Sequence, residues 1–314
     1  TEELSTHLND CDQRSILLGY LRDFRTIAHE LDDQKRPIWM SDVTGVKYFY
    51  ENDPLIPSDD EGMKITHEYL DMIGPQMYLE RIGLKAEDRP NENDDFYQHN
   101  AIINDIVNEV VMTAEEYKIP ATVSFGIIYE PIPERDTQMF IDKVVEHDLY
   151  LSLNKGIQGF QIYSWLAPNS STNPEFADED TWNWYKDAWY KHVKTFTDHK
   201  LDYAYLWGER RDDLTVEILS GPSRIQWEER GEFFDFPTIS MQNIQYGDNR
   251  YLILTNSADS DGQDVTVRIG NIPQRCASVL DIREGLYLSK ESSFTTTLPP
   301  LGVKLYRFDK DGDC

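Results

Sequence analysis

The apolar residues of this chain change their spacing about two-thirds of the way along it. Before residue 203, short apolar runs alternate with segments in which apolar side chains recur every three to four positions. Beyond it, they recur at every second position in short runs. Buried strands alternating with amphipathic helices indicate a parallel sheet covered by helices, whereas short alternating strands indicate an antiparallel sandwich. We therefore predict an α/β domain over 1–205 and an all-β domain over 206–314.

Four short apolar runs in the first part of the chain are separated by helical patterns. The strongest pattern places Ile103, Ile106, Val107, Val110, Ala114 and Tyr117 on one helical face. An earlier one, over 12–33, aligns Leu17, Leu21, Phe24, Ala28 and Leu31. The four runs, which we predict to be strands, are Ile38–Val43, Met72–Leu79, Ala121–Tyr129 and Ile157–Trp165.

The last third of the chain contains short β runs divided by turn residues. Gly247-Asp248-Asn249 and Ser260-Asp261-Gly262 are such turns. The runs are Leu214–Leu219, Tyr251–Leu254, Val265–Ile269, Val279–Ile282, Phe294–Leu298 and Val303–Phe308.

These runs resemble parts of glycoside hydrolases. The segments RPIWMSD (36–42), DMIGPQMY (71–78), IPATVSFGIIYE (119–130) and IQGFQIYSW (157–165) are similar to the fifth, sixth, seventh and eighth barrel strands of such enzymes. RYLILTN (250–256) and FTTTLPPLGVKLYRF (294–308) resemble closing strands of the domain that follows the barrel. The resemblance implies a partial (β/α)8 TIM-type barrel, strands five to eight, over 1–205, with a C-terminal antiparallel β-sandwich over 206–314.

A barrel of this kind needs eight strands and about 250 residues, and this sequence supplies four strand–helix units. An open half-barrel would expose a sheet edge and part of its core to water. We therefore expect a fragment of a longer polypeptide, or a barrel completed by another segment. A complete four-stranded α/β domain, with an accidental hydrolase resemblance, is the third interpretation.

Carboxylates at the strand ends are the candidates for catalysis. The resemblance implies a nucleophile at the end of the seventh strand, where Glu130 stands, and an acid/base residue after strand four, outside this sequence. Retaining glycosidases hold these two carboxyl groups about 5 Å apart. Asp42, at the end of the fifth strand, is a second candidate for the rim of the site. The plainer interpretations are a solvated loop glutamate and a turn or cap aspartate.

Aromatic and amide side chains on the same strands are candidates for binding sugar. Aromatic faces stack on the C–H faces of sugars, and amides hydrogen-bond hydroxyl groups. Ordinary core packing is the alternative for the aromatic residues. The candidates are Trp39, Gln76, Tyr78, Tyr163 and Trp165.

Charge narrows the range of partners. The chain has 30 basic and 57 acidic residues and a net charge of −27, which makes nucleic acid an improbable partner and suits an extracellular or cell-surface protein. No apolar stretch approaches the roughly 20 residues of a membrane span. Zinc spacings and phosphate loops are absent from the sequence, so no cofactor is required. Alternating Asp309, Asp311 and Asp313 resemble the opening of a calcium loop, with an acidic linker as the plainer interpretation.

Two functions fit this sequence. The first is an extracellular glycoside hydrolase that acts by the retaining two-carboxylate mechanism with Glu130 as its nucleophile. The second is a non-catalytic barrel-plus-sandwich module of a surface or extracellular assembly, which binds glycan or neighbouring subunits. The two differ in whether an acidic residue follows strand four.

Overall fold

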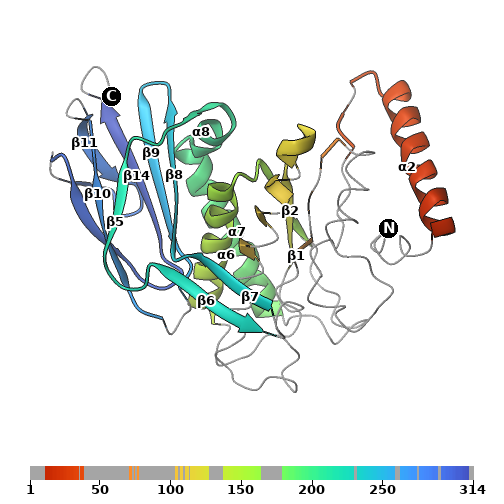
Figure 1. Ribbon diagram of the computed structural model, residues 1–314. Coiled ribbons are helices and arrows are strands. Elements are labelled where there is room, and N and C mark those ends of the chain that lie inside the picture. Colours follow the sequence, from red (N-terminus) through yellow and green to blue (C-terminus); the bar gives the residue numbers. More distant parts are fainter. Residues whose placement is uncertain are drawn as a thin grey trace. The chain divides into compact units, whose positions relative to one another are not determined.

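The fold is a mixture of helices, a parallel sheet and antiparallel sheets (Figure 1). The computed structural model describes residues 11–34, 36–38, 71–72, 74, 76–77, 103–104, 107–108, 110–112, 114–126, 137–163, 179–229, 232–258, 262–273, 276–288 and 291–310. They belong to two compact units, one with helix α2 and strands β1–β3, the other with helices α6–α8 and strands β4–β14. Within these ranges, no helix has both the length and the apolar character that crossing a membrane would require.

The first unit contains a parallel sheet with the order β1-β2-β3. The strands are β1 (Gln76–Met77), β2 (Thr122–Gly126) and β3 (Gly159–Tyr163). They lie inside the second, third and fourth predicted runs, and each begins later than predicted. On β2, Val123 and Phe125 are buried and so are Thr122 and Ser124, so both faces of this strand are covered. Of the first run, only Ile38 is described, and it is not in a strand.

The helix between β1 and β2 confirms most of its predicted face, although Tyr117 is 36% exposed and Ile106 lies outside the described residues. Ile103, Val107, Val110 and Ala114 are helical and buried, while Met112 is 69% exposed. Helix α2 (Cys11–Leu31) differs, because Phe24 and Leu31 were predicted for its inner face and are 60% and 79% exposed. Periodicity identifies which residues share a face, and it does not say whether another element covers that face.

Asp71 connects α2 to the beginning of the sheet. Arg25 donates hydrogen bonds at 3.0 and 2.8 Å to its Oδ1, and the Ile38 amide donates one at 2.8 Å to its Oδ2. His29 Nε2 lies 2.7 Å from the same Oδ2. Burial alone would raise the pKa of Asp71, but these hydrogen bonds outweigh burial and lower it. The carboxylate is therefore a structural anchor between segments far apart in the sequence.

The second unit contains two antiparallel sheets and a hairpin. One sheet has the order β12-β11-β14-β9-β8-β4, the other β13-β10-β5, and β6 pairs with β7. The strands are β4 (Glu209–Arg210), β5 (Thr215–Ser220), β6 (Arg224–Glu229), β7 (Glu232–Pro237), β8 (Ile239–Tyr246), β9 (Asn249–Asn256), β10 (Val265–Gly270), β11 (Cys276–Asp281), β12 (Leu286–Leu288), β13 (Phe294–Leu298) and β14 (Val303–Lys310).

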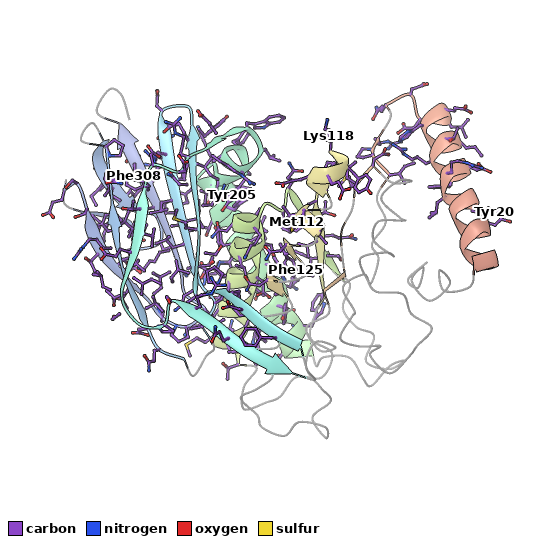
Figure 2. The ribbon with its side chains drawn as sticks, in the orientation of Figure 1. Tyr20, Met112, Lys118, Phe125, Tyr205 and Phe308 are labelled. Atoms are coloured by element: carbon purple, nitrogen blue, oxygen red, sulfur yellow. The ribbon has the colours of Figure 1, made fainter. Side chains whose placement is uncertain are left out.

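The two larger sheets share one hydrophobic core. Val265 and Val267 on β10 belong to the same buried cluster as Leu254 on β9 and Tyr306 and Phe308 on β14, and Figure 2 labels Phe308. All six predicted β runs overlap observed strands. Strand β8 and the β6–β7 hairpin were not predicted. On β8, polar side chains such as Gln242 and Asn243 occupy buried positions and hide the alternation.

Three helices complete the second unit. They are α6 (Gln138–Lys155), α7 (Glu179–Asp198) and α8 (Leu201–Trp207). One aromatic side chain from each meets in a cluster: Phe196 of α7 lies 6.3 Å from Tyr150 of α6 and 5.6 Å from Tyr205 of α8, measured between ring centroids. Helix α8 was not predicted, and neither was β4 at Glu209, which precedes the first predicted β run at Leu214.

Two glycines with open space around them should respond oppositely to alanine. Nothing lies within 4 Å of a Cβ added at Gly19 in α2 or at Gly247 in the β8–β9 turn, but Gly247 has a φ of +56°. We expect Gly19→Ala to raise the free energy of unfolding by up to about 1 kcal/mol and Gly247→Ala to lower it by about 1 kcal/mol. Urea denaturation measures both, and equal shifts would contradict the assigned backbone conformations.

Candidate functional site

The candidate site is the carboxyl-terminal edge of the parallel sheet. Met77 on β1 is paired with Phe125 on β2, and Gly126 on β2 is paired with Tyr163 on β3. The three strands are parallel and nearly in step, so they end at the same edge. Active sites of parallel α/β folds form at this edge, from the loops that follow the strands.

The backbone brings part of the predicted site to this edge. Gln76 lies in β1, and Tyr163 is the last residue of β3. The predicted nucleophile Glu130 follows β2 in the chain and lies outside the described residues. So do the other strand-end candidates, Trp39, Asp42, Tyr78 and Trp165. Their roles stay predictions.

Asp309 is the only described member of the predicted calcium tail, since Asp311 and Asp313 lie outside the described residues. Its carboxylate accepts hydrogen bonds from Arg307 at 2.5 and 3.2 Å, and Tyr287 donates a third at 3.3 Å. This hydrogen bonding raises the pKa of Arg307. Among the described residues, no group of three or more acidic, histidine or cysteine side chains is arranged to hold a metal ion. Calcium binding by the tail stays a prediction.

A buried ionic network that was not predicted joins α6, α7 and the β11–β12 turn. His192 on α7 lies between two carboxylates of α6, with Nε2 3.1 Å from Asp142 Oδ1 and Nδ1 3.5 Å from Glu146 Oε1. Lys191 pairs with Asp142 at 2.6 Å, and Arg283 pairs with Glu146 at 2.9 Å. The signal in the sequence was a pair of acids, Asp142 and Glu146, four positions apart on one helix.

The pKa values of the two acids in the network, Glu146 and Asp142, are shifted in opposite directions. Burial raises the pKa of Glu146, and the opposite charge of Arg283 only partly offsets this. Burial acts in the same direction on Asp142, but hydrogen bonds from His192 and Lys191 outweigh it and lower the pKa of Asp142 to about 2. Both side chains of the Glu146–His192 pair are at least 96% buried, so a substrate has no direct access to that pair.

A second buried cluster has the order of a serine–histidine–acid relay. His147 Nδ1 lies 3.1 Å from Asp148 Oδ1, and His147 Nε2 lies 3.2 Å from Ser257 Oγ. The three residues are at most 1% exposed, which leaves no path for a substrate to the hydroxyl. The cluster therefore links α6 to the residue that follows β9 and does not form a nucleophilic site.

Sequence comparisons find no relatives, whereas solved structures do match. No protein-family model and no curated protein match the chain. A GH51 arabinofuranosidase from Xanthomonas axonopodis pv. citri matches over 93% of this chain and 63% of its own, at 10% identity and a TM-score of 0.50. An α-amylase from Geobacillus thermoleovorans matches over 94% and 57%, at 12% identity and a TM-score of 0.43.

A third match is a GH30 endoxylanase from Clostridium papyrosolvens, at 12% identity and a TM-score of 0.40, over 93% of this chain and 59% of its own. This chain therefore spans less than two-thirds of the length of each of these three structures. At such low identity the likeness concerns the fold alone. The chain has a fold similar to that of glycoside hydrolases, as the resemblance of its strands predicted.

Proposed function

We propose that this chain is part of a glycoside hydrolase that acts on an extracellular glycan. The observation that carries the proposal is a parallel sheet, in the strand order expected for strands six to eight of a (β/α)8 barrel, followed by two antiparallel sheets with a common core. We infer that these two sheets are the β-sandwich that follows the barrel in such enzymes. The fold likeness to the GH51 arabinofuranosidase supports this assignment.

The rest of the barrel would come from outside this sequence. A closed barrel needs eight strands, and the parallel sheet of the described residues has three. We infer that a preceding segment of a longer polypeptide supplies strands one to four and the acid/base carboxylate. The chain covers 63% of the length of the GH51 arabinofuranosidase, which agrees with part of the barrel lying outside this sequence.

Within the site, Glu130 would act as the nucleophile of a retaining mechanism. In that mechanism the carboxylate attacks the anomeric carbon, the sugar–oxygen bond breaks, and the acid/base residue protonates the leaving oxygen. Water then releases the sugar with the original anomeric configuration. Gln76 in β1 and Tyr163 at the end of β3 would bind the sugar there, together with Tyr78 and Trp165.

The proposal is tested by hydrolysis of a glycan panel by the natural polypeptide that contains this chain. We expect release of reducing sugar from at least one neutral glycan, and proton NMR early in the reaction should show the substrate's anomeric configuration in the product. Inversion would contradict the retaining mechanism. A protein that binds a glycan in the panel without cleaving it would instead be the non-catalytic module of a surface assembly.

A further inference from the structure

A hollow of about 310 Å³ opens between the first turns of α6 and the N-terminal half of α7. Its lining includes Gln138 and Asp142 from α6, and Trp184, Asp187, Ala188 and Lys191 from α7. On α7, Asp187, Ala188 and Lys191 are three, four and seven positions from Trp184, and on α6 Asp142 is four positions from Gln138, so they share a face. Ala188 is 4% exposed and has the smallest of these side chains, so it leaves the space of the hollow unfilled. The volume is at the lower end of the range of small-molecule sites, about 300 Å³.

The lining combines an aromatic surface with fixed polar groups. Trp184 is half-buried, and Gln138, Asp187 and Lys191 are exposed. Asp142 is fixed by His192 at 3.1 Å and Lys191 at 2.6 Å. A carboxylate has about four lone-pair sites, so Asp142 can accept further hydrogen bonds from a ligand. Hydroxyl donors from a ligand would therefore meet an ionised, immobile acceptor.

We propose that this hollow, formed by Trp184, Asp187, Gln138 and Asp142, is a binding site for a neutral sugar residue of a glycan chain. An indole beside planar carboxylate and amide acceptors matches the apolar face and the hydroxyl edge of a sugar ring. The ligand class rests on the proposed function, but the site is separate from the strand ends and requires no catalysis.

Charge selects a neutral ligand over an anionic one. Two of the lining residues are acidic, and the cation of Lys191 is already paired with Asp142. The chain as a whole carries a net charge of −27, which repels uronic acids and phosphates. A neutral sugar avoids this repulsion and still satisfies the carboxylate acceptors.

The test places a reporter in the hollow. The polypeptide carrying Glu130→Gln is labelled with 5-fluorotryptophan, and the Trp184 signal is assigned in the fluorine spectrum by its loss in Trp184→Phe. Xylohexaose, arabinohexaose and maltohexaose are then titrated, with oligogalacturonate as the anionic comparison. We expect the Trp184 signal to shift saturably with at least one neutral sugar, and Asp187→Ala to weaken that binding about tenfold because a charged hydrogen-bond acceptor is lost.

Tyr190→Ala is the matched control, because Tyr190 is on the same helix, is 66% exposed and does not line the hollow. It should leave the titration unchanged. A Trp184 signal that does not shift with any neutral sugar, or that shifts as strongly with oligogalacturonate, would contradict the proposed site. A shifted Trp184 signal in a polypeptide whose wild-type form hydrolyses no glycan would support the site and refute the proposed function, so the two failures are distinguishable.

Discussion

Replacing Glu130 with glutamine should abolish glycan hydrolysis by the natural polypeptide and leave its fold intact. An amide cannot attack the anomeric carbon as a carboxylate does, so the glycosyl–enzyme intermediate would not form. We expect kcat to fall at least about 10⁴-fold, within the roughly 10⁶-fold loss that follows removal of a serine nucleophile. Such a loss corresponds to about 5 kcal/mol of activation free energy. Initial rates of reducing-sugar release measure the change.

Glu134→Gln is the control, because this acid follows Glu130 by four positions in the same interval between β2 and α6. It should keep kcat within about twofold, since an acid outside the chemistry contributes little to it. A 2-fluoroglycoside should label the wild type by the mass of one sugar, at the peptide that contains Glu130. Undiminished turnover in Glu130→Gln would remove this residue from the mechanism, and a label on another carboxylate would identify the true nucleophile.

The sequence was sufficient to predict those elements in which apolar spacing coincides with burial. Val123 and Phe125 on β2, and Ile103, Val107, Val110 and Ala114 on the preceding helix, are buried as their spacing predicts. The spacing of apolar residues did not predict β8, because polar residues such as Gln242 and Asn243 are buried on this strand. The same spacing did not predict which residues of α2 are buried, because the exposure of Phe24 and Leu31 depends on what packs beside the helix and not on the helix itself.

The candidate site was predictable only in part. Parallel strands end at one edge whatever their side chains, so apolar runs alone bring the ends of β1, β2 and β3 together. The ionic network could not be found in this way, because Glu146 pairs with Arg283, 137 positions later in the sequence. Such a pair leaves no local pattern. The acids on α6 were visible in the sequence, but their partners were not.

Removing Arg283 should therefore destabilise the protein in a pH-dependent way. Glu146 is buried, and Arg283 supplies the opposite charge at 2.9 Å. Removing one partner of a fully buried pair costs about 3–5 kcal/mol. The Arg283 side chain is 33% exposed, so we expect Arg283→Met to lower the free energy of unfolding at about pH 8 by less, about 2 kcal/mol. Urea denaturation of the whole chain measures this loss.

The sign of the pH dependence follows from Glu146. Its pKa is raised in the folded state, and loss of the Arg283 charge raises it further. The folded variant then takes up a proton more readily than the unfolded chain as pH falls, so the destabilisation should shrink between about pH 8 and about pH 5. Arg283 also donates a hydrogen bond to the Val303 carbonyl, at 3.2 Å, which does not titrate. The part of the loss that depends on pH therefore does not come from this hydrogen bond.

Arg268→Met is the matched control for Arg283→Met, because it removes the same charge from an exposed ion pair. Arg268 pairs with Glu217 at 3.0 Å, but the two side chains are 50% and 61% exposed. Solvent screens such a pair, so the loss should stay below about 1 kcal/mol and change little with pH. Combining Arg283→Met with Glu146→Gln should reduce the pH dependence, because the carboxyl group that Arg283 faces is then absent. A loss in Arg283→Met that is equal at both pH values would show that Glu146 is not held as a buried charge.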